Sequence, residues 1–105
     1  MWILIYPRMN ISLKKFGTTL VSRQLGKEAF NAFKPNLNDV LENELIEIDF
    51  SEVITLSPAW GDEFLSPLLD QFGKRVVLIN TGNSSVKATL ELLDKLEGKK
   101  FRILS

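Results

Sequence analysis

"LIEIDFSEVITLSPAWGDEFLSPLLDQF", residues 45–72, decides the fold of this chain. The run Leu45–Phe50 interleaves two acids with apolar residues, which is typical of a partly buried β-strand. Large apolar residues then recur every four positions from Trp60 to Phe72, and leucines widen the stripe. This spacing predicts a helix with one broad buried face. A strand followed closely by such a helix indicates an α/β fold.

The tripeptide Leu-Ser-Pro occurs twice in this stretch. Ser57 and Pro58 suit the N-cap and the first position of a helix, because a serine hydroxyl accepts from a free amide and proline has none to lose. Ser66 and Pro67 repeat the pattern inside the predicted helix. An interior proline costs about 3 kcal/mol. The helix therefore either kinks or restarts at Pro67, and the sequence leaves both open.

Toward the N-terminus, the apolar run Trp2–Tyr6 closes at Pro7 and residues 10–13 continue with alternating character. These segments are two strands, or one strand interrupted at Pro7. A helix is predicted next, capped by Thr19 or Ser22 and stopped by Pro35. Its apolar positions at helical spacing are Leu25, Ala29, Ala32 and Phe33.

Toward the C-terminus, "RVVLIN" (75–80) has the apolar character of a strand buried on both faces of a parallel sheet. A helix follows, capped by Asn83 or Ser84 and ended by Gly98, and "FRIL" (101–104) is the last strand. The order is ββαβαβαβ. We expect residues 1–105 to form a single α/β domain, with a mixed, mostly parallel sheet of four to five strands and about three helices.

The composition excludes several classes of site. The chain has no cysteine and no histidine, which removes disulfides, thiolate chemistry, histidine-based catalysis and the usual zinc sites. Thirteen basic and thirteen acidic residues give a net charge of zero, so no general field attracts nucleic acid or a membrane surface. The apolar start "MWILIYP" is too short for a membrane helix and lacks the pattern of a signal peptide. We expect a soluble, cytoplasmic protein.

The strand, the segment "DFSEV" and the helix opening "SPAWGDEF" resemble the STAS domains, the fold of bacterial anti-sigma factor antagonists. More narrowly, the sequence resembles the bacterial STAS-like family of unknown function, over residues 11–104, with "WGDEF" after "IDFSEV" as the most specific piece. That family usually has a cluster of small hydroxyl residues and then an aromatic residue before the acidic pair. Here Ser57, Pro58, Ala59 and Trp60 occupy these places, so two hydroxyl positions are apolar.

The resemblance implies a binding module whose partner is an ATPase or kinase of the anti-sigma or histidine-kinase type. In the anti-sigma antagonists, a serine at this junction is phosphorylated by a partner kinase, which releases the complex. A helix N-terminus does stabilise phosphate. However, Pro58 offers no amide, and Asp62 and Glu63 lie close enough to repel phosphate. The residues therefore favour Ser57 as a cap over Ser57 as a phosphorylation site.

The acidic pair has one favoured role and two weaker ones. Asp62 and Glu63 suit complementarity to the helix N-terminus better than acid–base catalysis or a magnesium site, because adjacent helical residues point about 100° apart. As exposed charges they can still set partner specificity. Trp60 heads the apolar stripe, so a core role is favoured over an interface anchor.

Two further segments could suggest a phosphate-related site, but their residues disfavour it. Asp49, at a strand end, suggests the phosphorylated aspartate of a receiver domain, but the first strand ends in "YPR" without metal ligands. The turn "NTGNSSV" (80–86) lacks a phosphate-binding motif and is favoured as a turn and helix cap. No cofactor or metal site is predicted.

The favoured hypothesis is a non-enzymatic protein-binding module that docks through Ser57, Pro58, Trp60, Asp62 and Glu63. Lysine at both acidic positions is expected to weaken docking and leave the fold intact. The alternative is a homo-oligomeric scaffold that pairs through the apolar strand of residues 1–7, because an unpaired edge strand is a template for a second copy. An enzyme that uses only carboxylates and hydroxyls is disfavoured.

Overall fold

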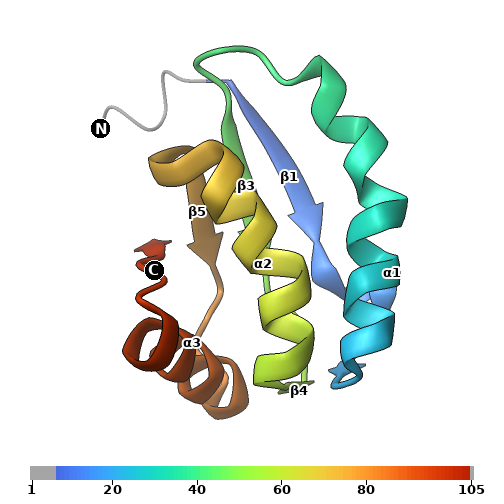
Figure 1. The fold of residues 1–105 in the computed structure, drawn as a ribbon, viewed down its shortest axis with the longest axis vertical. Coiled ribbons are helices and arrows are strands. Elements are labelled where there is room, and N and C mark those ends of the chain that lie inside the picture. Colours follow the sequence, from blue (N-terminus) through green and yellow to red (C-terminus); the bar gives the residue numbers. More distant parts are fainter. Residues whose placement is uncertain (1–6, 105) are drawn as a thin grey trace.

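The computed structural model describes residues 7–104. Within these residues, six strands and three α-helices follow one another (Figure 1). Their bounds are β1 Arg8–Ser12, β2 Thr19–Leu20, α1 Arg23–Phe33, β3 Leu45–Asp49, β4 Thr55–Leu56, α2 Pro58–Phe72, β5 Val76–Ile79, α3 Ser84–Glu97 and β6 Arg102–Leu104. Three 3-10 helices connect them: η2 Leu13–Phe16, η3 Lys34–Asp39 and η4 Gly73–Arg75.

The strands form two parallel sheets. Four strands pair in the order β1-β3-β5-β6, and every pairing is parallel. The short strands β2 and β4 form a separate parallel pair. The predicted fold class, a single α/β domain with a mostly parallel sheet and three helices, is confirmed.

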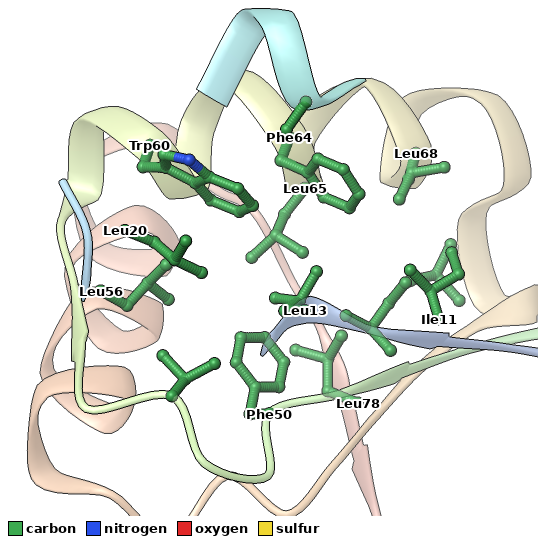
Figure 2. Packing of buried hydrophobic residues seen from close by; sticks show 14 of the residues in the cluster. Ile11, Leu13, Leu20, Phe50, Leu56, Trp60, Phe64, Leu65, Leu68 and Leu78 are labelled. Carbon is green, nitrogen blue, oxygen red and sulfur yellow. The ribbon is translucent and has the colours of Figure 1, made fainter. Parts of the chain in front are cut away.

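One core lies between the helices and one face of the larger sheet. Every second residue of the central strands faces this core, among them Ile46, Ile48 and Leu78. Each of the three α-helices adds fully or largely buried side chains to the same cluster. Figure 2 shows Trp60, Phe64 and Leu65 of α2 above Leu13, Phe50 and Leu78. The wide apolar stripe predicted for α2 is therefore the centre of the core.

The opposite face of the sheet carries three polar residues and one valine in register. Asn10, Glu47, Val77 and Arg102 are neighbours across the four strands. Glu47 is buried and accepts hydrogen bonds from Arg8 at 2.9 Å and from Asn10 at 2.8 Å. The acid interleaved in the central strand thus has partners on its neighbour strand, as a buried carboxylate requires.

The structure decides between the alternatives for α2. The helix runs unbroken from Pro58 to Phe72 with Pro67 inside it, so it does not restart at Ser66. Ser66 instead donates to Asp62 Oδ1 at 2.8 Å, one turn earlier. Because Pro67 has no N–H, the carbonyl of Glu63 lacks its usual helical donor.

The other boundaries follow the caps that the sequence offered. Ser22 caps α1 and Asn83 caps α3, and Gly98 ends α3 in the left-handed region with φ 68°. The predicted strand of residues 2–6 lies outside the described residues. The hypothesis that this strand pairs two copies of the chain therefore stays a prediction. The sequence did not indicate β2 and β4, because two residues are too few for an alternating pattern.

No helix in the described part of the chain combines the length and apolar character needed to cross a membrane.

Candidate partner-binding surface

The predicted site residues lie where β4 passes into α2. The pair β2–β4 holds this junction, since Ser57 N donates to Leu20 O at 2.9 Å and Thr55 N donates to Thr18 O at 3.1 Å. Two helices therefore begin side by side, α1 just after β2 and α2 just after β4. Each begins at a serine in extended conformation, Ser22 or Ser57.

Ser57 is an N-cap, as the sequence favoured. Its Oγ accepts from Trp60 N at 3.1 Å, which satisfies one of the free amides of the first turn. The same hydroxyl donates to Val21 O at 2.7 Å. Ser57 therefore caps α2 and also ties it to the segment that leads into α1.

Asp62 and Glu63 have a cationic partner that sequence reasoning missed. Arg23 Nη1 lies 2.8 Å from Glu63 Oε2 and 3.3 Å from Asp62 Oδ2. Hydrogen bonds to Asp62 and then Glu63 raise the pKa of the Arg23 guanidinium. No sequence signal pointed to Arg23, because it lies about 40 residues before the acids. One arginine thus spans both carboxylates and links α1 to α2.

This pairing corrects the role expected for the two acids. The first turn of α2 contains no acidic residue, and the effect of the helix dipole fades beyond that turn. Arg23, and Ser66 in the case of Asp62, are the observed partners instead. Both carboxylate side chains are about one-quarter exposed. Both carboxylates remain at the surface, and each forms a salt bridge with Arg23 of the same chain.

Trp60 belongs to the core, which was the favoured interpretation. Its side chain is 1% exposed and stacks on Phe64, with ring centroids 5.0 Å apart and planes 17° apart. The alternative, in which Trp60 projects from the surface as an interface anchor, does not agree with this burial. Its main chain also packs closely against Gly26 of α1, where an added Cβ would lie 2.9 Å from Trp60 O.

Three large apolar residues in the segments that form the junction are exposed. Val21 is 46% exposed, Leu25 59% and Ile54 63%, and they account for three of the seven exposed large hydrophobic residues in the described chain. Val21 and Ile54 flank the β2–β4 pair, and Pro58 is exposed at the start of α2. We call Val21, Leu25, Ile54, Ser57 and Pro58 the docking surface. Sequence reasoning placed Leu25, Ala29, Ala32 and Phe33 on the apolar stripe of α1. Ala29 and Phe33 are buried, together with Gly26, whereas Leu25 and Ala32 are exposed.

A second polar cluster lies where β3 and β5 end. Asp49 Oδ1 accepts from Ser51 N and from Asn80 Nδ2, both at 2.9 Å. Burial raises the pKa of the Asp49 carboxyl, but hydrogen bonds from Asn80 and Ser51 and the charge of Lys14 outweigh it, so the net pKa is lowered. Asn80 lies in the left-handed region, with φ 56°. Within residues 7–104, no three acidic side chains gather as metal ligands do.

The turn before α3 has the capping role that the sequence favoured. Asn83 Oδ1 accepts from Ser85 N at 2.8 Å and from Val86 N at 3.0 Å. Asn83 Nδ2 donates to Ile54 O at 3.1 Å, so this cap also fixes the loop that presents Ile54. The side chain that caps α3 therefore helps to position the docking surface.

Comparisons of the chain with protein-family models, with curated proteins and with solved structures find no match.

Proposed function

We propose that this chain is a non-enzymatic, regulatory protein-binding module of STAS-like type that engages its partner through the docking surface. The observation that carries the proposal is that the exposed side chains of Val21 and Leu25 line one groove with Trp60 of α2, while Ile54 is exposed at the other end of the β2–β4 pair. Exposed apolar side chains with a polar rim are typical of protein interfaces. The resemblance suggests an ATPase or kinase of the anti-sigma or histidine-kinase type as the partner.

The charged neighbours support a role in specificity. Arg23, Asp62 and Glu63 form a rim beside the apolar residues, and Arg23 is more than half exposed. Charges at a rim guide association and reject wrong partners more than they add affinity. Because the two acids are already paired with Arg23, lysine at both positions also breaks an internal contact. Replacing the apolar residues is therefore the cleaner test.

The experiment places a photoreactive amino acid at position 25 of the full chain in its host, and at position 96 as the control. Leu96 is 70% exposed on α3, away from the docking surface. We expect position 25 to crosslink a protein that position 96 does not. With that protein purified, Leu25→Asp should weaken binding roughly tenfold or more, and Leu96→Asp less than about twofold.

Equal crosslinking from both positions, or equal losses of affinity in both variants, would remove this surface from the proposal. Crosslinks only to a second copy of the chain would instead favour the homo-oligomeric scaffold.

A further inference from the structure

A groove of about 310 Å³ opens between α3 and β6, and we call it the β6 groove. One wall is a single face of α3, formed by Lys87, Leu90, Glu91 and Asp94. The other wall contains Phe101, just before β6, and Ile103. Strand residues two apart point to the same side, and Ile103 is in register with Leu78, which faces the core. The helix-facing side of β6 therefore lines the groove.

Strand β6 is also an edge of the sheet. It pairs with β5, and no other described strand lies beside it. An edge strand is a template for a further strand. When a segment binds by strand addition, main-chain hydrogen bonds give affinity, and a groove for alternate side chains gives specificity. An edge strand with a groove along it, and with Ile103 51% exposed, therefore indicates an extended polypeptide segment as the occupant.

The charges of the lining indicate that this segment is uncharged. The two lysines and two acids of the groove cancel. Lys99 already forms a salt bridge with Asp70, and Asp94 forms one with Lys100. A charged segment would gain no net attraction, whereas apolar side chains can bury area against Phe101 and its neighbours.

The chain itself contains a segment with this chemistry. Residues 2–6, "WILIY", are apolar, carry no charge and have a high preference for strands. Five extended residues measure about 16 Å. The face of α3 that lines the groove rises about 10 Å between Lys87 and Asp94. The segment is therefore long enough to fill the groove.

The segment is too short to fill the groove of its own chain. It precedes β1, which is at the opposite edge of the described sheet from β6. A strand added beside β6 would lie four strand spacings from β1, about 19 Å. Six residues span at most about 21 Å, so crossing the sheet would leave none to lie along β6.

We propose that residues 2–6 of one copy add to β6 of a second copy as a further strand, with alternate side chains in the β6 groove. The contact is heterologous, because it joins two different parts of the chain. This inference does not rest on the docking surface, and it gives the homo-oligomeric alternative a defined acceptor.

The test is analytical ultracentrifugation of the full chain over a range of concentrations. We expect the wild type to self-associate. Ile103→Asp in the groove and Ile5→Asp in the added segment should each weaken association roughly tenfold or more, because each places a charge in an apolar contact. Leu96→Asp is the matched control, since Leu96 is 70% exposed on α3 and outside the groove lining, and it should leave association unchanged.

A mixture of the two weakened variants identifies the parts that meet. The Ile103→Asp chain keeps an intact segment, and the Ile5→Asp chain keeps an intact groove. The mixture should therefore form a dimer at concentrations where neither variant associates alone. Because the Ile103→Asp chain only donates its segment, any local damage to its own β6 does not prevent this result.

A wild-type chain that stays monomeric at millimolar concentration would overturn the proposal. So would self-association that Ile103→Asp leaves intact, as expected if two N-terminal segments pair with each other, or a mixture that does not associate. Leu25→Asp tests the docking surface and should not change self-association, so the failure of one proposal is distinguishable from the failure of the other.

Discussion

At the scale of single residues, the hydroxyl of Ser57 both accepts and donates a hydrogen bond. It accepts from Trp60 N and donates to Val21 O, so it has no proton left for another acceptor. Phosphorylation would remove the proton that Val21 receives and place negative charge near Asp62 and Glu63. A phosphate at Ser57 would therefore act by loosening the junction between β2 and α2.

Two substitutions separate the roles of this hydroxyl. Ser57→Ala loses the cap, about 1 kcal/mol, and the bond to Val21, about another 1 kcal/mol. Ser57→Asp keeps a good cap but cannot donate, so it should lose only the second part. Urea unfolding measures both values, with exposed Ser84→Ala as the control. Equal losses in the Ala and Asp variants would mean that the cap contributes nothing.

Asp49 provides a prediction about pH. Asn80 Nδ2 helps to lower the pKa of the Asp49 carboxyl, and Asn80 sits at φ 56°. Asn80→Gly removes the donor but keeps a backbone that glycine adopts freely. We expect NMR titration to show a higher pKa for Asp49 in this variant, and an unchanged pKa would exclude Asn80 as a cause.

The sign of the stability effect follows from the direction of the shift. A lowered pKa in the folded protein stabilises it above the unfolded pKa of about 3.9. That contribution is lost as the pH falls through the folded value. The difference in unfolding free energy between wild type and Asn80→Gly should therefore shrink below about pH 4.

At the scale of elements, the contact between α1 and α2 organises the site. Gly26 lets the backbone of α1 approach Trp60, and Arg23 joins the same two helices at the surface. Phe30 and Phe33 of α1 then meet Phe64, with ring centroids 6.1 Å apart in each case. Both helices begin at the β2–β4 pair, so their spacing also sets the width of the docking surface.

Gly26→Ala tests this close approach. Alanine is the better helix former by about 1 kcal/mol, yet its Cβ would meet Trp60 O at 2.9 Å and Trp60 Cα at 3.0 Å. Because those atoms are backbone, the helices must separate, and we expect a net loss of about 1–3 kcal/mol in urea unfolding. Gly82→Ala, in the turn before α3, is a control for the added methyl group alone, since its Cβ meets nothing within 4 Å. A stabilised Gly26→Ala protein would mean that α1 moves without cost.

At the scale of the whole molecule, the sequence predicted those strands and helices that have long apolar patterns. The central strands and the broad stripe of α2 were clear because each buries a continuous set of side chains. The buried face of α1 was assigned partly wrongly, since Gly26 marks the closest contact but carries no apolar side chain to reveal it. The contacts of Arg23 with Asp62 and Glu63 could not be predicted for a different reason. They depend on how the sheet positions α1 beside α2, and no local sequence pattern encodes the relative position of two helices.

The topology makes a last prediction, about where the molecule opens. In the order β1-β3-β5-β6, β3 and β5 have a neighbour on each side, and most of their residues are buried. Strand β6 has three residues, pairs with β5 alone in the described part of the chain, and leaves Ile103 51% exposed. Few buried contacts mean a low free energy of local opening.

Native-state hydrogen exchange measures this difference strand by strand. We expect the hydrogen-bonded amides of β3 and β5 to exchange only through global unfolding, at the free energy that urea unfolding gives. The amides of β6 should exchange at least about tenfold faster, which corresponds to an opening free energy about 1.4 kcal/mol lower. Equal protection in β5 and β6 would contradict this expectation, because it would make the edge strand part of the same cooperative unit as the core.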